Sequence, residues 1–411
     1  MTGFYKSFRD EIAAGGAVED DGSPTRNGRA MGLLMLAGLV ALAVISPWTF
    51  VFVLGLLVCV FLHEVGHFLT ARLTGMKATQ FFMGFGPRVF SFRRGETEYG
   101  VRALPLGAFV RIIGMNNIDD VDPDDEPRAY RSKSYPRRLL VITAGSLMHM
   151  LIAFVLLVGV YTVSGSWTHT GLAEVQGIAP DSPASAAGMR NGDIIVSIGG
   201  KPVTTHGSVV DAIVVHDPGE TVEVIWDSGG TLRNADITLA ESPADNGIGF
   251  LGVYATDIVN KRLGPLTAVG RSIGEMGTTM SGSVSGVVTV LNPLNSIEQI
   301  TNEDAPVENR PTTVVGMSQV GGSVGRNEGL AGVLRLLAYV NVFVGLFNMF
   351  PVLPFDGGHA AIATYERIRS RRGRAPYRAD VNKMVPLATA VMALLLFLFV
   401  TGLYLDVTRP F

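Results

Sequence analysis

The side chains best suited to chemistry are two histidines and a glutamate in the stretch FLHEVGHFLT, residues 61–70. His63 and His67 are four residues apart, so on a helix their imidazoles share one face, with Glu64 one step round. Two such imidazoles can hold zinc while the glutamate accepts a proton from the attacking water, as in zinc hydrolases. With 7 histidines and 36 acidic residues in 411 positions, chance placement gives roughly 0.01 such motifs. A hydrogen-bonded histidine pair is the alternative, but it would leave Glu64 without a cation in apolar surroundings.

A catalytic zinc site needs a third protein ligand and an open position for water. The best candidate is Asp356, in the stretch NMFPVLPFDGGH that covers residues 348–359. Pro351 and Pro354 end the preceding helix, so the backbone beyond must line protein or a water cavity rather than lipid. A turn aspartate at a membrane edge is the other interpretation. We expect Asp356 to be the ligand, because it falls on the same side of the membrane as His67.

The composition indicates a membrane protein. Of the 411 residues, 47% are hydrophobic and 17% are charged, against about 25% charged residues in an average soluble domain. A helical membrane span takes about 20 apolar residues. Candidate spans cover residues 31–46, 48–73, 139–163, 330–351 and 385–405. Pro47 separates the first two, which could be two spans or a single kinked one.

The basic residues orient these spans. With five spans, the segments rich in arginine and lysine all face one side, which is the cytoplasm by the positive-inside rule. The block 164–327 is then extracytoplasmic. The net charge of -3 and the absence of a basic stripe predict no nucleic-acid partner. Cys59, the single cysteine, excludes an intrachain disulfide framework and is interpreted as inert filler in an apolar run.

The predicted fold is a polytopic α-helical membrane protein of about five transmembrane helices, with a membrane-associated β-hairpin segment and one extracytoplasmic PDZ-like domain. Its predicted parts are a flexible cytoplasmic tail (1–30), transmembrane helices with HEVGH (31–75), the β segment (76–115), an acidic cytoplasmic loop (116–135), a transmembrane helix (136–163), the PDZ-like domain (170–245), an extracytoplasmic juxtamembrane region (246–328) and the last transmembrane helices (329–411). The acidic run 119–128 is interpreted as a solvated loop; a calcium site is the less favoured alternative, because its spacing fits no EF-hand loop.

Together these motifs resemble the site-2 protease family of intramembrane zinc metalloproteases, in particular the regulator-of-sigma-E protease group and its actinobacterial members. The resemblance covers about residues 48–405 and includes HEVGH, GFGPRVFSFRRGETEYGVRALPLGAFVRIIGM and NMFPVLPFDGG. It implies a bacterial plasma-membrane enzyme that cleaves transmembrane segments of single-pass proteins such as anti-sigma factors. It also implies zinc ligation by His63, His67 and Asp356, with Glu64 as catalytic base. Substrate binding is implied for Asn348, Pro351, Pro354, Gly84 and Gly86, the glycines within a β-structure that adds a strand to an unwound substrate.

The chain departs from this family pattern in the third span. Many members carry Ala-Gly-Pro-x-x-Asn, whereas this chain has Ala144, Gly145 and Ser146, with His149 at the asparagine position. His149 is either a hydrogen-bonding replacement near the site or a packed polar residue, and a fourth zinc ligand is less favoured because it would close the water position. Phe355 stands where many members have leucine.

Two other function classes compete with the protease. An inactive membrane-anchored scaffold could display the PDZ-like domain to capture peptides, but it would have no use for Glu64. A zinc transporter would need polar residues spread along several spans, whereas here they cluster at one depth.

Overall fold

The computed structural model describes residues 26–115, 119–243, 247–302, 305–306, 309–370 and 377–411. Most of the flexible tail predicted over residues 1–30 lies outside the described residues. The described chain divides into two compact units. The first, here called the helical unit, comprises Met1–Val160 and Pro265–Phe411, and the second, the β unit, comprises Tyr161–Gly264.

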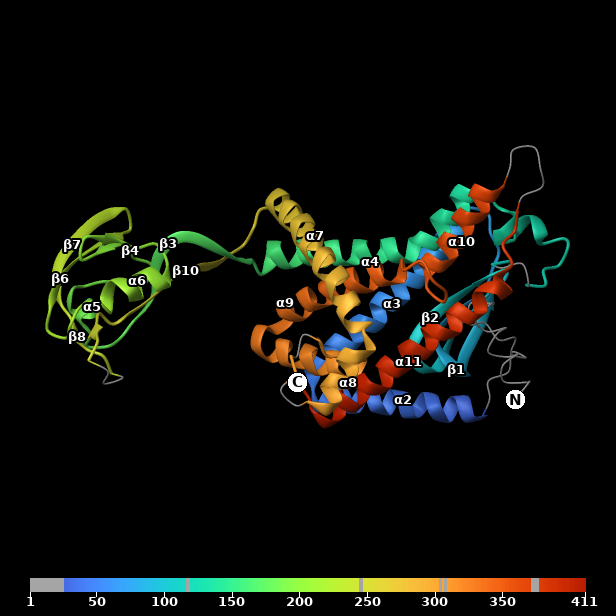
Figure 1. Cartoon of the computed structure of the whole chain (residues 1–411), viewed down its shortest axis with the longest axis horizontal. Helices are drawn as coiled ribbons and strands as arrows, with labels where there is room; N and C mark the ends of the chain where they lie inside the picture. The colour runs from blue at the N-terminus through green and yellow to red at the C-terminus, as the bar shows by residue number, and fades with distance from the viewer. Residues whose placement is uncertain (1–25, 116–118, 244–246, 303–304, 307–308, 371–376) are drawn as a thin grey trace. The chain divides into compact units, whose positions relative to one another are not determined.

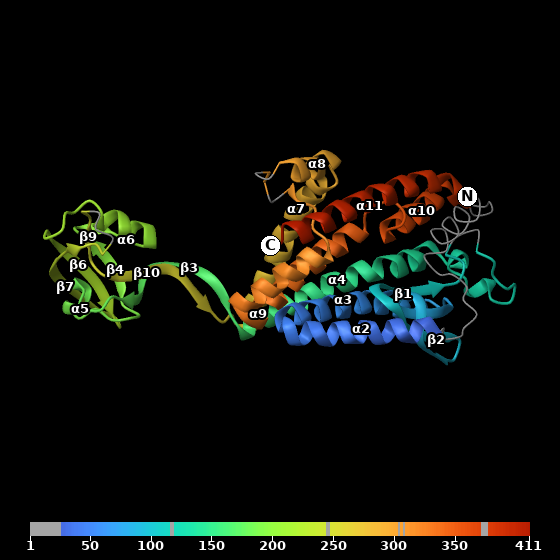
Figure 2. The same ribbon diagram turned by 90° about the horizontal axis from the view of Figure 1, so that it is seen from below.

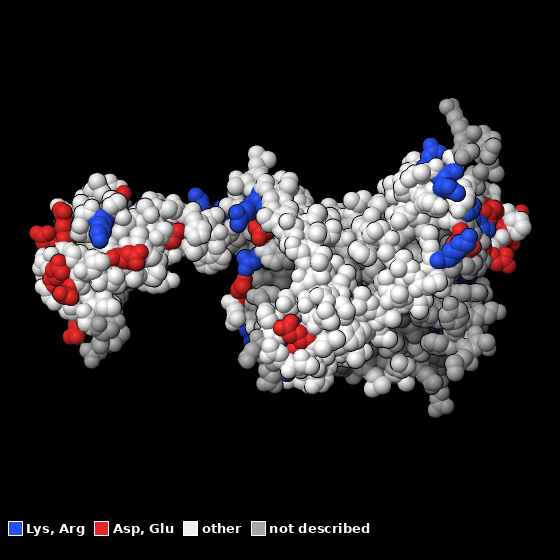
Figure 3. Space-filling model, viewed as in Figure 1, with Lys and Arg blue, Asp and Glu red and all other residues white. Residues whose placement is uncertain are grey.

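Five helices of the helical unit are long and apolar enough to cross a membrane, as the sequence predicts. They are α2 (Arg26–Ile45), α3 (Pro47–Leu73), α4 (Tyr135–Val163), α9 (Val314–Asn348) and α11 (Val385–Thr408). Ser46 has non-helical backbone angles and Pro47 starts α3, so the first two apolar runs form two helices. On the face shown in Figure 3, the charged side chains of this unit gather mainly toward its two ends.

Helices α3 and α9 pack along each other (Figures 1 and 2). Phe52 of α3 is fully buried with Val333 and Leu337 of α9. A Cβ on Gly321 would come within 2.3 Å of the Phe52 ring, so the glycine makes room for that ring. Helix α9 begins well before the predicted start of the fourth span and bends at Gly329, whose φ is 65°.

The predicted β segment forms a more complex sheet than a simple hairpin. Strands β1 (Ala78–Arg94) and β2 (Thr97–Ile112) are joined by a tight turn. Residues 80–83 have partners on both sides, in 98–101 and in 108–111. The two long strands therefore bend back on themselves, and the register shifts repeatedly along their length. This sheet contacts both α2 and α3.

The described part of the acidic loop is tied to its surroundings rather than simply solvated. It contains the short helices η1 (Glu126–Arg128) and η2 (Tyr130–Ser132). Asp125 pairs with Lys77, and Glu126 with Arg131. Tyr130 is buried in the core formed with α3 and α4. Three further helices complete the unit: α7 (Pro265–Val290), α8 (Pro293–Thr301) and α10 (Asp356–Arg369), with a 3-10 turn η4 (Val381–Met384) before α11.

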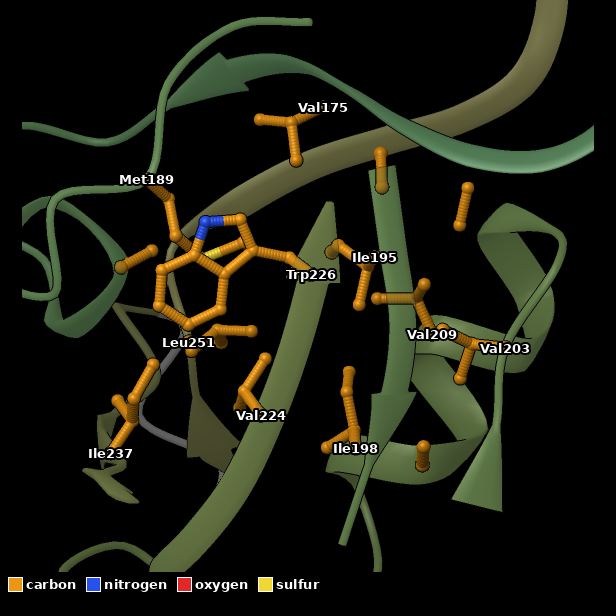
Figure 4. Packing of buried hydrophobic residues seen from close by; sticks show 14 of the residues in the cluster. Val175, Met189, Ile195, Ile198, Val203, Val209, Val224, Trp226, Ile237 and Leu251 are labelled. Atoms are coloured by element: carbon orange, nitrogen blue, oxygen red, sulfur yellow. The ribbon is translucent and has the colours of Figure 1, made fainter. Parts of the chain in front are cut away.

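The β unit is a six-stranded antiparallel sheet with two short helices. The strand order is β10–β3–β4–β6–β7, with β5 paired to β4. The bounds are β3 Ser166–Ile178, α5 Pro183–Ala186, β4 Ile194–Ile198, β5 Lys201–Pro202, α6 His206–Ile213, β6 Thr221–Ser228, β7 Thr231–Thr238, a separate pair β8 Ala240–Glu241 and β9 Gly249–Phe250, and β10 Val253–Lys261. Trp226 lies in its core beside Met189 (Figure 4). This arrangement agrees with the expected PDZ-like unit.

Candidate metal centre

Three side chains predicted to hold a metal come together, although Asp356 lies nearly 300 residues from the two histidines in sequence. Nε2 of His67 lies 3.1 Å from Nε2 of His63. Oδ2 of Asp356 lies 3.2 Å from Nε2 of His67 and 3.6 Å from Nε2 of His63. These three residues form a group of donor atoms that could hold one metal ion.

The donor set fits zinc. Nitrogen and oxygen ligands about 2.0–2.1 Å from a tetrahedral zinc lie roughly 3.3 Å apart, close to the three measured separations. Oδ2 of Asp356 is buried and makes no well-formed hydrogen bond within the described chain, so a cation would satisfy it. Nδ1 of His67 lies 2.8 Å from the carbonyl oxygen of Val141. It therefore donates its proton there and leaves Nε2 free to bind a metal.

The turn between α9 and α10 places Asp356. Asp356 is the first residue of α10, and Phe355 precedes it as the N-cap. A Cβ on Gly357 would lie 2.2 Å from the Met349 backbone, and a Cβ on Gly358 would lie 2.5 Å from the backbone at Leu353. Only glycine fits at both positions, because the start of α10 packs directly on the backbone of the turn. The two glycines after Asp356 thus let its carboxylate reach the histidines of α3.

Glu64 lies beside this group. Its Oε1 is 3.9 Å from Nε2 of His63, and its side chain is mostly buried. The backbone of Val110, in β2, lies beside its carboxylate. The glutamate is thus near enough to take a proton from a water in the group, and β2 helps to fix its position.

Helix α4 supplies a wall of the centre, of which the sequence pattern had raised only His149 as a candidate neighbour of the site. Val141, Gly145 and His149 follow one another at intervals of four and share a face. A Cβ on Gly145 would lie 2.3 Å from Nε2 of His67 and 2.6 Å from Nε2 of His63. The His149 ring lies 4.8 Å from the His63 ring, centroid to centroid. The glycine keeps space open at the metal-binding nitrogens; its only sequence signal was its place in the Ala-Gly motif.

The residues expected to bind substrate lie on two other segments. Asn348 ends α9, and Pro351 and Pro354 lie in the turn before Asp356, both with exposed side chains. Gly84 and Gly86 lie at a bend in β1, with φ values of 87° and 79°. They belong to the β sheet rather than to the metal group.

Two imidazoles and a glutamate on a helix that can span a membrane, with a carboxylate that follows a second such helix, define a membrane zinc hydrolase. The comparisons with known proteins agree. The family model described as "Peptidase family M50" matches residues 51–397, so the chain belongs to that family. It is a zinc metalloprotease of the site-2 protease type, and its cofactor is zinc.

Among its relatives, zinc metalloprotease Rip1 of Mycobacterium tuberculosis is 30% identical over 394 residues, which cover 87% of this chain and 96% of Rip1. Rip1 of Mycolicibacterium smegmatis is 32% identical over 398 residues, which cover 87% and 97%. Among solved structures, the PDZ domain of the SdrC-like protein of Listeria monocytogenes is 27% identical. That match covers 22% of this chain and 92% of the domain, with a TM-score of 0.20, too low to carry an argument about the fold.

Proposed function

We propose that this zinc metalloprotease hydrolyses peptide bonds within transmembrane segments of single-pass membrane proteins of the anti-sigma-factor type. The observation that carries the proposal is the position of the metal group. His63 and His67 lie on α3, a helix apolar enough to span a membrane, and Asp356 follows another such helix, α9. A peptide bond reaching these side chains would therefore lie among the spans.

We assign the roles from the geometry of the centre. His63, His67 and Asp356 would hold the zinc, which when bound would supply a Lewis acid for the scissile carbonyl and for the attacking water. Glu64 accepts the proton of the attacking water and then passes it to the leaving amine. Gly145 leaves the fourth side open for water and substrate. The inactive-scaffold alternative gains no support, because all four of the side chains that hydrolysis requires meet in one place.

An extended substrate is a requirement of this chemistry, since a helical peptide bond is protected by its own hydrogen bonds. We assign substrate holding to the irregular segment of Asn348, Pro351 and Pro354 and to the β1–β2 sheet at Gly84 and Gly86. A sheet edge can bind an unwound strand through its backbone. The closeness of the Val110 backbone to Glu64 supports this assignment, because it brings the sheet beside the proposed base.

The orientation in the bilayer follows from charge. We assign the β unit to the outside of the cell and the metal centre to the cytoplasmic face of a bacterial plasma membrane, because with five spans the basic segments then all lie in the cytoplasm. A cysteine introduced at residue 10 in a Cys59→Ser background should react with an impermeant label only after permeabilisation. Labelling of intact cells would contradict the orientation.

The decisive test of the function is Glu64→Gln, which keeps the size of the side chain but removes the base. Zinc content should stay unchanged, while cleavage of a reconstituted single-pass substrate should fall by about 10²- to 10⁴-fold. Glu298→Gln, on the exposed surface of α8, is the matched control and should cleave normally. Undiminished cleavage by purified Glu64→Gln protein would refute the assignment.

A further inference from the structure

The two histidines of the metal group are held in different ways. Nδ1 of His67 donates to the carbonyl oxygen of Val141, the kind of hydrogen bond that ordinarily orients a metal-binding imidazole. Nδ1 of His63 is buried and makes no such bond of good geometry within the described chain; the backbone contact of this ring is with Gly145. Beyond this backbone contact, the orientation of the His63 ring depends on the side chains packed against it.

The ring of His149 provides that packing. Its centroid lies 4.8 Å from that of His63, and the two planes are inclined by 41°. His149 is only 3% exposed, and its Nδ1 lies 2.7 Å from Oδ1 of Asn341 on α9. The imidazole that supports His63 is thus itself held by a short, buried hydrogen bond.

The side-chain amide of Asn341 is fixed in one orientation by its other hydrogen bonds. Its Nδ2 donates to the carbonyl oxygen of Leu337, at 2.7 Å, and to Sγ of Cys59, at 3.1 Å. Oδ1 must then face His149 and accept the proton on Nδ1. Side chains of α3, α9 and α4 thus form a continuous series of contacts, which runs from Cys59 through Asn341 and His149 to the His63 ring.

Close packing of α9 against α4 makes this series of contacts possible. A Cβ on Gly345, one turn after Asn341, would lie 2.9 Å from Cβ of His149 and 2.8 Å from Cε of Met150. The glycine lets α9 approach α4 until the amide of Asn341 meets the imidazole. His149 itself lies outside the group of donor atoms that could hold the metal.

We propose that His149 and Asn341 are positioning residues that hold His63 in its metal-binding orientation, His149 through its ring and Asn341 by fixing that ring. The inference rests on the proposed role of His63 as a zinc ligand. A chain with asparagine at position 149 would have no ring there to support His63.

The test measures zinc affinity of the full-length protein in detergent by chelator competition. His149→Ala and Asn341→Leu should each weaken zinc binding by about 10- to 100-fold. The double variant should bind zinc no more weakly than His149→Ala alone, because both residues act through the same ring. The double variant His149→Phe/Asn341→Leu places at position 149 an aromatic ring that has no N–H group and so needs no hydrogen-bond acceptor. Its zinc affinity should return to within a few-fold of the wild type. Ser146→Ala, buried on the same helix, should leave affinity unchanged.

Cobalt substitution gives a second readout that general destabilisation would not move, measured on the monodisperse fraction of each variant. The visible absorption of the cobalt protein should change in His149→Ala and return in the phenylalanine double variant. Unchanged affinity and spectrum in His149→Ala, or no recovery in the phenylalanine double variant, would overturn the proposal. So would X-ray absorption showing three imidazoles on the metal that fall to two in His149→Ala, which would make His149 a ligand.

His63→Ala separates this inference from the function on which it rests. If that variant kept its zinc, the ligand assignment itself would fail. If it lost zinc while His149→Ala bound zinc normally, only the positioning role would be wrong.

Discussion

At the residue scale, Gly145 limits what the metal centre can accept. A methyl group there would lie 2.3–2.6 Å from both metal-binding nitrogens, in the space that zinc and water require. Gly145→Ala should therefore lower zinc content and cleavage together, as metal analysis of the purified protein would show. Gly159→Ala is the matched control: it lies on the same helix, with nothing within 4 Å of its Cβ. Normal zinc content in Gly145→Ala would contradict this account of the open side.

The residues of the centre differ in how far the sequence could predict them. His63, Glu64 and His67 lie within one turn of a helix, so their spacing alone predicted a shared face. Asp356 could be inferred because few ionisable residues occur in apolar surroundings. Gly145 and Asn341 could not, because their roles arise only where α4 and α9 approach other helices, and no local pattern encodes that approach.

At the element scale, Asp406 fastens α11 to the start of α9. Asp406 is fully buried and accepts hydrogen bonds from the amides of Thr313 and Gly316, and from the Thr313 hydroxyl. Arg310 donates to its other oxygen at 3.0 Å. One carboxylate thus caps the N-terminus of α9 and neutralises a mostly buried guanidinium, so it joins two helices that are distant in sequence.

Removing Asp406 should destabilise the helical unit more than any surface change. Asp406→Ala would leave Arg310 without its buried partner, which typically costs about 3–5 kcal/mol. Thermal unfolding in detergent would measure the loss. Thr408→Ala, on an exposed part of the same helix, is the control and should unfold like the wild type. A melting temperature unchanged by Asp406→Ala would show that the ion pair contributes little.

The sequence predicts helices and strands reliably where the apolar composition of a segment determines its structure. Five long apolar runs gave five helices, because only a helix satisfies the backbone of such a run in lipid. The hairpin pattern predicted that β1 pairs with β2, but it did not predict the repeated register shifts, which depend on bends at positions such as Gly84. The early start of α9 depends on caps from Thr313 and from Asp406, which lies beyond the predicted fifth span.

At the scale of the whole molecule, the β unit should screen substrates rather than take part in hydrolysis. On the orientation proposed above, it lies outside the cell, while the metal centre lies near the cytoplasmic face. A substrate with a folded extracytoplasmic domain would then collide with it, whereas a short substrate lacking that domain would pass. Deleting the β unit should leave cleavage of the short substrate almost unchanged and permit cleavage of the untrimmed parent.

The competing role is capture of a newly made C-terminus in the groove of the PDZ-like unit, where a peptide can add to a strand edge. Capture predicts slower cleavage of the short substrate after deletion, with the parent still intact. Both substrates can be compared in one membrane preparation. We favour screening, because a substrate already confined to the bilayer gains little from a second tether.

The β unit also begins and ends at one place on its own surface. Ser166 pairs with Lys261 across β3 and β10, and the amide of Leu263 donates to the carbonyl oxygen of Tyr161. A segment whose two ends meet can be lost, exchanged or duplicated without stretching the chain on either side. If the screening role proposed above holds, replacing this unit would change which substrates reach the metal centre and would leave the helices that carry His63 and His67 unaltered.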